Sequence, residues 1–134
     1  MNEFELEIVT PDGLLFEGNA RKIILRTVEG DVGILPRHSD YVAPLAIGVA
    51  RVFTQSGERS AACAGGMVSV MNGIVRVVAS TFEWSEDIDV ARALKAKEKA
   101  QTRLEESKHS DYEHRLAEIK LKKSLARLSA SERK

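Results

Sequence analysis

The most constraining feature of this sequence is the point at which its glycines and prolines stop. All nine glycines and all three prolines precede Ser85, and the stretch from Ser85 to Lys134 contains neither. That stretch is dominated by Ala, Leu, Lys, Arg and Glu, which favour helix, whereas glycine and proline interrupt it. The chain is therefore predicted to consist of two units, residues 1–84 and residues 85–134, of which only the second is helical.

The first unit has the pattern of short antiparallel strands. Phe4, Leu6 and Ile8 alternate with glutamates and give one buried face, and Pro11-Asp12-Gly13 then forms a turn. Asn72-Gly73 separates two later apolar runs and favours a two-residue hairpin, because both positions tolerate positive φ. These signals predict an antiparallel β-sandwich or flattened barrel. The expected strands cover residues 4–8, 14–16, 22–27, 48–54, 59–64, 67–71 and 74–78.

The second unit is predicted to form a hairpin of two helices. Ser85 or Asp87 is placed to cap the first helix, and Ser110 or Asp111 offers a second cap after a polar interruption. We expect helices at about 87–106 and about 111–129. The apolar stripes are Ala93, Ala96, Ala100 and Leu104 on the first helix and Tyr112, Leu116, Ile119, Leu121, Leu125 and Leu128 on the second.

A helical hairpin of this size has little core of its own. Below about 70–80 residues a core rarely contributes more than about 3–5 kcal/mol. The stability of the hairpin must therefore come from docking on the β unit or on another protein. Because docked and undocked arrangements then differ by only a few kcal/mol, a ligand or a partner surface can shift the population between them.

Charge is balanced overall but differs between the units. Residues 1–84 carry seven Lys/Arg and ten Asp/Glu, whereas residues 85–134 carry thirteen and ten. The basic excess around Lys120, Lys122, Lys123 and Arg127 is either a solvated helix face or a contact for an acidic protein or an anionic ligand. We expect no nucleic-acid partner, because the β unit is acidic and aromatic residues are not interleaved with the basic ones.

Cys63 is the single cysteine, which excludes an intrachain disulfide and indicates a reducing compartment. It lies in an apolar strand and is expected to be a small core residue rather than a nucleophile. The sequence shows neither a leader-like segment nor an apolar run long enough to span a bilayer. We therefore expect a soluble chain without direct membrane insertion. If the chain meets a membrane, we expect another protein to bring it there.

The segment Glu29–His38 has neither strand nor helix periodicity, and its two glycines and proline predict a shaped loop. His38 is the residue in it that suggests metal binding or acid–base chemistry. His109 and His114 lie in a distant helical segment, and no Cys or carboxylate stands beside His38 at ligand spacing. No metal site is predicted here.

Five dispersed motifs together resemble the epsilon subunit of bacterial F-type ATP synthases. The match spans the whole chain in the family's order, and the combination is specific although each motif alone is weak. The motifs are Ile8–Gly13, Glu29–His38, Ala43–Leu45, Gly65–Val70 and Ile88–Ala93.

The resemblance implies an α+β fold, an N-terminal β-sandwich followed by a C-terminal helical hairpin. It implies a rotor subunit of the central stalk, bound to the gamma subunit and seated on the c-subunit ring. The location implied is peripheral, at the cytoplasmic face of the bacterial cell membrane. The sandwich would couple catalysis to ion flow, and the hairpin, extended toward the alpha and beta subunits, would inhibit ATP hydrolysis. No catalytic site of its own and no required cofactor are implied.

The resemblance also places one loop of the β unit toward the c ring. The corresponding residues are Glu29, Gly30, Asp31 and His38. The family usually has glycine at the position of Arg37, and a more apolar run follows where this chain has Ser39-Asp40-Tyr41. These departures predict a contact surface that is more polar, or shifted.

Some bacterial epsilon subunits bind ATP in the folded hairpin. Their signature is similar to Ile88-Asp89-x-x-Arg92-Ala93 with an acid at the position of Glu83. Asp89, Arg92 and Lys99 share a helix face at three- and four-residue spacing. Arg92 and Lys99 would hold phosphates, and Glu83 or Asp89 would accept from the adenine amino group or orient the arginine.

The second helix would add Lys122, Lys123 or Arg127 to this ATP site. Tight binders tend to carry arginine where this chain has Lys99, which predicts weaker phosphate recognition. The sequence equally permits an interpretation without nucleotide, in which Asp89 caps the helix and Arg92 forms a salt bridge with the sandwich. Hydrolysis at the site is not expected, because no Walker-type loop, metal-binding pair or positioned base is present.

Two hypotheses from other classes remain beside the rotor subunit. The first is a free-standing ATP-sensing module whose hairpin closes on the nucleotide, which titration of the isolated protein beside Arg92→Ala would distinguish. The second is an enzyme that uses Cys63 or His38, and it ranks last because neither residue has a base and an orienting group nearby in the sequence.

Overall fold

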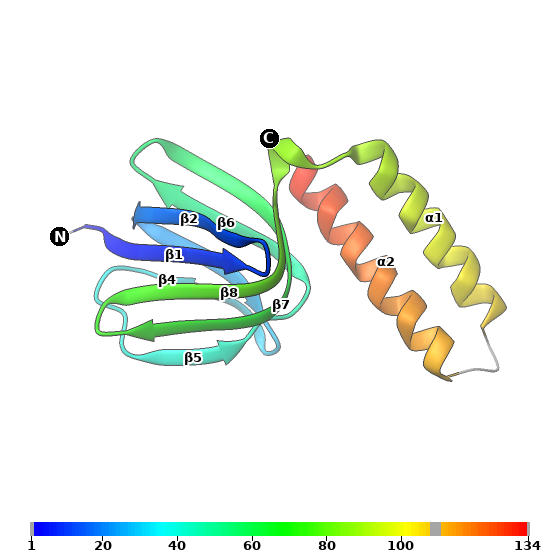
Figure 1. Ribbon diagram of the computed structural model, residues 1–134, viewed down its shortest axis with the longest axis horizontal. Helices are drawn as coiled ribbons and strands as arrows, with labels where there is room; N and C mark the ends of the chain where they lie inside the picture. The colour runs from blue at the N-terminus through cyan, green and yellow to red at the C-terminus, as the bar shows by residue number, and fades with distance from the viewer. Residues whose placement is uncertain (1, 108–110, 134) are drawn as a thin grey trace.

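The computed structural model describes residues 2–107 and 111–133, and it contains a β unit followed by two helices (Figure 1). The expected α+β architecture is confirmed. The strands are β1 (Phe4–Thr10), β2 (Gly13–Ala20), β3 (Lys22–Thr27), β4 (Gly30–Ile34), β5 (Tyr41–Pro44), β6 (Gly48–Thr54), β7 (Gly57–Met71) and β8 (Ile74–Trp84). A 3₁₀ turn η1 (Ser85–Asp87), α1 (Val90–Glu106) and α2 (Asp111–Ser131) follow.

The strands form a sandwich in the order β2-β1-β8-β7-β6-β3-β4, with β5 paired to β7 outside this path. β1 pairs with β8 in parallel, and the other pairs are antiparallel. Residues 57–63 of β7 pair with β6, whereas residues 67–70 pair with β5. β7 therefore joins the two layers along one continuous strand.

Two local predictions for the β unit were wrong, and one strand was missed. Residues 30–34 form the edge strand β4 rather than an irregular loop, because Val32 is half-buried and Ile34 buried while Asp31 and Gly33 face solvent. The short strand β5 was not predicted. The two runs on either side of Gly65-Gly66 are one strand, since both glycines adopt positive φ and bend β7 without ending it.

The close approach of the neighbouring strand also requires that Gly66 has no side chain. A Cβ at this position would lie 1.9 Å from the Val78 carbonyl oxygen of the neighbouring strand. The predicted Asn72-Gly73 hairpin is confirmed, with φ of 52° and 80° at these two residues.

The sandwich core consists mainly of large aliphatic residues that are almost completely buried. Most come from the alternating positions that the sequence predicts, and Cys63 is buried among them as expected. The largest fully buried hydrophobic side chains are Leu6, Ile8, Ile23, Leu25, Ile34, Val52, Val68, Val70, Val75 and Val77. The β unit is thus stabilised by its own packing.

The buried face of the hairpin differs from the predicted one. Ala93 and Ala100 of α1 are buried as expected, but α2 buries small residues, Ala117, Ser124, Ala126 and Ala130. Much of the predicted apolar stripe of α2 lies at the surface, with Tyr112 73% and Leu125 45% exposed. Small side chains let the two helices and the sandwich approach closely, and they leave the larger ones outside.

Candidate functional site

The hinge segment, residues 85–89, joins β8 to α1. Asp89 is the N-cap of α1, and its side chain accepts a hydrogen bond of 3.1 Å from the Arg92 amide. The expected cap at Ser85 or Asp87 was wrong, because these residues form η1 and Ile88 then returns to extended backbone. The helix therefore starts at Val90, three residues later than predicted.

Two contacts fasten the hinge segment to the sandwich. The Arg59 guanidinium lies 3.7 Å from the ring centroid of Trp84 and 2.6 Å from a Glu86 carboxylate oxygen. The bond from Arg59 lowers the pKa of Glu86 below its ordinary value. Ile88 is buried against Ala62 of β7. The hinge segment is thus held to the sandwich at both Glu86 and Ile88 while the helices are docked.

α2 contacts the sandwich through small residues. Ala126 and Ala130 pack with Ala62 and Ile88 in a group that we call the docking cluster, with Ile47 and Val49 at its margin. Figure 1 shows α2 meeting the sandwich at its C-terminal end and diverging from it toward its N-terminal end. The area that holds the hairpin to the β unit is therefore limited.

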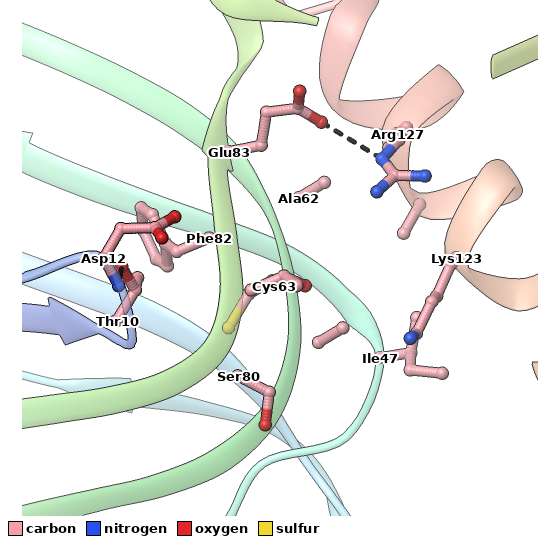
Figure 2. A pocket seen from close by; sticks show the side chains of 13 residues that line it. Thr10, Asp12, Ile47, Ala62, Cys63, Ser80, Phe82, Glu83, Lys123 and Arg127 are labelled. Carbon is pink, nitrogen blue, oxygen red and sulfur yellow. Dashed lines mark hydrogen bonds and ion pairs between the residues drawn. The ribbon is translucent and has the colours of Figure 1, made fainter. Parts of the chain in front are cut away.

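One salt bridge joins the β unit to α2 among the described residues. The Arg127 Nε atom donates to a Glu83 carboxylate oxygen at 3.1 Å, and both side chains are 38% exposed. Figure 2 shows this pair at the edge of a cavity of about 260 Å³ between β8, β7 and α2. Asp12 and Glu83 line the cavity from the sandwich side, and Lys123 and Arg127 line it from α2. The cavity thus has acids on one wall and cations on the other.

A second, smaller cavity lies between the two helices. It has a volume of about 190 Å³, and the small residues Ala96, Ala100 and Ser124 form part of its lining. Four cationic side chains surround it, those of Lys99, Arg103, Lys120 and Arg127. Phosphate oxygens are the ligands that such a cluster suits. Arg127 also lines the first cavity, so it lies between the two.

The structure brings together only some of the residues predicted to bind ATP. Glu83, Lys123 and Arg127 share the first cavity, and Lys99 shares the second with Arg127. The remaining residues have other environments. Lys122 is on another side of α2 and lines a separate groove, so of the three alternatives on the second helix only Lys123 and Arg127 line these cavities.

The first turn of α1 confirms only one of the two parts of the interpretation without nucleotide, the cap by Asp89. Asp89 caps the helix, Ala93 is buried, and the Arg92 side chain is exposed. Among the described residues, Arg92 forms no salt bridge with the sandwich, contrary to the interpretation without nucleotide. ATP binding at this site stays a prediction.

Sequence reasoning missed two cations of the inter-helix cavity, Arg103 and Lys120. Arg103 follows Lys99 by four residues and so continues its helix face, which was a usable signal. Lys120 belongs to the basic cluster predicted on the second helix. Whether its side chain points toward α1 depends on how α2 is rotated about its own axis. Ser124, whose hydroxyl donates to the Lys120 carbonyl within α2 at 2.9 Å, is buried beside this cavity.

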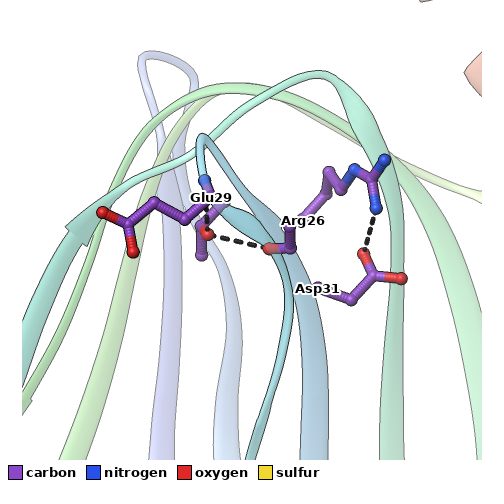
Figure 3. A network of polar contacts seen from close by, with 5 residues as sticks. Arg26, Glu29 and Asp31 are labelled. Atoms are coloured by element: carbon purple, nitrogen blue, oxygen red, sulfur yellow. Dashed lines mark hydrogen bonds and ion pairs between the residues drawn. The ribbon is translucent and has the colours of Figure 1, made fainter.

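The four residues predicted to face the c ring do not form one surface. Glu29, Gly30 and Asp31 lie at the β3–β4 turn, where Arg26 pairs with Asp31 at 3.3 Å and the Thr27 hydroxyl donates to the Gly30 carbonyl (Figure 3). His38 follows the far end of β4, because Ile34 pairs with Ile23 whereas Gly30 pairs with Thr27. Five residues of extended strand separate the two places, roughly 13–17 Å at about 3.3 Å per residue.

Neither Cys63 nor His38 has the surroundings of a catalytic group. Burial raises the pKa of the Cys63 thiol to about 12, so it stays protonated near neutral pH. The His38 Nδ1 donates to the Ser39 carbonyl at 2.8 Å, and its ring packs edge-on against Tyr41. Within residues 2–107 and 111–133 there is no group of three or more His, Cys, Asp or Glu arranged to hold a metal ion. Neither helix in this part of the chain is sufficiently long and apolar to cross a membrane.

Comparison with known protein families gives two adjoining matches. Residues 3–85 match the β-sandwich domain of the ATP synthase delta/epsilon chain, and residues 86–132 match the long α-helix domain of the same chain. Together they span nearly the whole sequence.

Individual relatives agree with these matches. The chain is 42% identical to the ATP synthase epsilon chain of Exiguobacterium sp., covering 100% of this chain and 99% of the relative. It is 39% identical to that of Halalkalibacterium halodurans, covering 99% and 100%. Among solved structures, a chain of the Euglena gracilis mitochondrial ATP synthase (OSCP/F1/c-ring) has a TM-score of 0.85 at 25% identity, over 98% of this chain and 82% of that one. A Tetrahymena thermophila central stalk/c-ring chain has a TM-score of 0.60 at 14% identity, over 95% of each, and shares the fold.

Proposed function

The chain belongs to the ATP synthase delta/epsilon family, and on that premise we propose that it is a central-stalk rotor subunit whose C-terminal helices inhibit ATP hydrolysis when they leave the sandwich. It has no catalytic site of its own in this proposal and requires no cofactor. Its sandwich binds the gamma subunit and the c ring, and its extended hairpin meets the alpha and beta subunits. Its location is peripheral, at the cytoplasmic face of the bacterial membrane.

The observation that carries the regulatory part is the way the hairpin is docked. Among the described residues, the contact consists of the docking cluster, in which Ala126 and Ala130 are the α2 members, and of one salt bridge, Glu83–Arg127, that is 38% exposed on both sides. A partly exposed pair of this kind contributes only about 0.2–1 kcal/mol. The hairpin can therefore leave the sandwich without disturbing the core of large aliphatic residues.

A row of apolar residues on the outer face of the sandwich supports the rotor part. It follows the strand register from Pro44 to Met67, Val78, Val9 and Leu14. Met67, Val78 and Leu14 are 44%, 48% and 57% exposed. A continuous apolar row across five strands is typical of a surface covered by a partner, and we assign it to the gamma subunit.

The test of the regulatory part is truncation in the assembled ATP synthase. Removing residues 86–134 should raise ATP hydrolysis while the complex still assembles, because the sandwich surface is retained. Met67→Glu in the full-length chain is the matching test of the rotor part, and it should reduce assembly with gamma. Inhibition that survives the truncation would rule out the hairpin as the inhibitory element.

ATP sensing is the second part of the proposal, and the cationic inter-helix cavity favours it. Lys99, Arg103, Lys120 and Arg127 would hold the phosphates, and Glu83 would accept from the base once Arg127 turns to the nucleotide. A nucleotide held by both helices and by β8 would stabilise the folded hairpin by mass action. If the chain fails to join an ATP synthase, the same cavity supports the alternative of a free-standing ATP sensor.

Isothermal titration of the isolated chain with ATP, with and without magnesium, tests this part. Saturable binding that weakens at least about tenfold in Arg127→Ala would support it. Lys95→Ala, on an exposed part of α1, is the matched control. Arg92→Ala tests the exposed arginine of the signature separately. Absence of binding at millimolar ATP would leave the hairpin governed by partner subunits alone.

A further inference from the structure

A groove separate from the apolar row described above runs between α2 and the outer face of the sandwich. It has a volume of about 1120 Å³, and β3, β4 and β6 form one wall while α2 forms the other. It lies on a different side of α2 from the two cavities described above, since Lys122, Leu125 and Ser129 line it. An α-helix is about 10–12 Å across and rises 5.4 Å per turn, so the groove offers room for roughly two turns.

Several aliphatic side chains line the groove on both walls. Ile24, Ile47 and Val49 are half-buried on the sandwich wall, and Leu125 is 45% exposed on the opposite wall. A further aliphatic residue, Val28, is 64% exposed at the end of the groove near the β3–β4 turn. Apolar side chains of a third element would bury these surfaces without displacing the hairpin.

The groove is also strongly basic. Five cationic side chains line it, those of Lys22, Arg26, Arg51, Lys122 and Arg133, against the single carboxylate of Asp31. Asp31 is paired with Arg26, and Arg51 is paired with Glu58 outside the groove. Within the described part of the chain, Lys22 and Lys122 form no salt bridge. The groove therefore keeps uncompensated positive charge on both walls.

From this combination we propose that the groove binds an acidic amphipathic helix of another protein in the assembly, with its apolar side against the aliphatic side chains and its carboxylates against the cations. Such a helix would contact the sandwich and α2 at once, so it would hold the hairpin in the folded position. The proposal goes beyond the proposed function, because it names a partner surface that exists only while the hairpin is folded.

Site-specific photo-crosslinking in the intact ATP synthase tests the proposal. Leu125 is replaced by p-benzoyl-phenylalanine, and the same replacement at Leu94 of α1 is the control, since both leucines are 45% exposed. The expected result is an adduct at Leu125, and not at Leu94, with an acidic amphipathic helix of another subunit, identified by mass spectrometry. The Lys122→Glu change should reduce that adduct at least about fivefold, whereas Lys95→Glu should not. The absence of any adduct at Leu125, or an adduct with lipid or with a non-acidic segment, overturns the proposal.

A direct measurement on the isolated full chain keeps the proposal testable should the variant complex fail to assemble. The probe is a fluorescein-labelled synthetic helix of about fourteen residues with Leu on one face and Glu on the other. We expect saturable binding by fluorescence anisotropy, weakened at least about fivefold by Lys122→Glu and absent for a matching Leu/Lys peptide. Equal binding of the two peptides would overturn the proposal.

Discussion

The sandwich core and the docked face of the hairpin bury different kinds of side chain, although one chain of 134 residues builds both. Residues such as Leu25, Ile34 and Val52 are completely buried in the sandwich, whereas the buried positions of α2 hold alanine and serine. Buried aliphatic area contributes about 25 cal/mol per Å², so a face of methyl groups contributes far less than a core of leucine and isoleucine. The comparison teaches that the β unit holds itself together while the hairpin depends on its surroundings.

The largest effect is expected from shortening matched leucines in the two regions. Leu25→Ala should cost about 2–5 kcal/mol of unfolding free energy, because Leu25 is completely buried and its removal leaves a cavity. Leu125→Ala should change it by less than about 0.5 kcal/mol, since Leu125 is 45% exposed. Urea unfolding followed by the fluorescence of the single tryptophan, Trp84, measures both. Similar losses for the two variants would contradict the comparison.

The bend in β7 provides the next test. Gly66→Ala should destabilise the sandwich by roughly 2–4 kcal/mol, because the new Cβ collides with the Val78 carbonyl and the backbone is at positive φ. Gly57→Ala is the matched control, since Gly57 also has positive φ but has open space around it. The control should lose only about 1 kcal/mol in the same unfolding experiment. Equal losses of unfolding free energy for the two variants would mean that the collision with the Val78 carbonyl adds nothing to the cost of the positive φ.

A third test separates the hairpin from the sandwich. Ala130→Leu should force the docking cluster apart, because Ala130 is completely buried and overpacking costs about 1–3 kcal/mol. We expect faster hydrogen exchange of α2 amides and unchanged exchange in β1, β7 and β8, measured by mass spectrometry. Ala91→Leu, the same change at an exposed position of α1, is the control. Global loss of protection in the strands would mean that the two regions unfold together.

The smallest expected effect is a pH dependence at the hinge segment. Because the Arg59 guanidinium lowers the pKa of Glu86 from 4.5, the pair stabilises the fold above that pH and loses its contribution as the pH falls below it. Glu86 is an exposed group, so the contribution should be about 0.2–1 kcal/mol. The difference in unfolding free energy between the wild type and Glu86→Gln should be present at pH 7 and decrease as the pH falls below the ordinary pKa of a glutamate. A difference in unfolding free energy that stays constant as the pH falls would mean that the carboxylate charge has no part in the contact. Glu105→Gln is the control.

Much of the fold followed from local physical rules. Alternating apolar residues, the Asn72-Gly73 turn and the absence of glycine and proline after Ser85 determined most strands, one hairpin and both helices. The edge strands β4 and β5 were missed because they are short and half-exposed, and β5 in addition pairs with a strand that is distant in the sequence, β7. The sequence predicts an end of the strand at Gly65-Gly66, whereas the structure has a bend, because two consecutive glycines are the same local signal for either outcome.

The sequence by itself determined the two-unit architecture, the buried thiol of Cys63 and the presence of cations on α2, because propensity, periodicity and composition act over a few residues. Only the tertiary structure decided which cations share a cavity, that Lys122 faces a separate groove from Arg127, and that His38 and Glu29 lie at opposite ends of β4. These outcomes depend on the rotation of α2 against its neighbours and on strand pairing across the sandwich. Contacts between residues far apart in the chain set both, and no local pattern in one sequence encodes them.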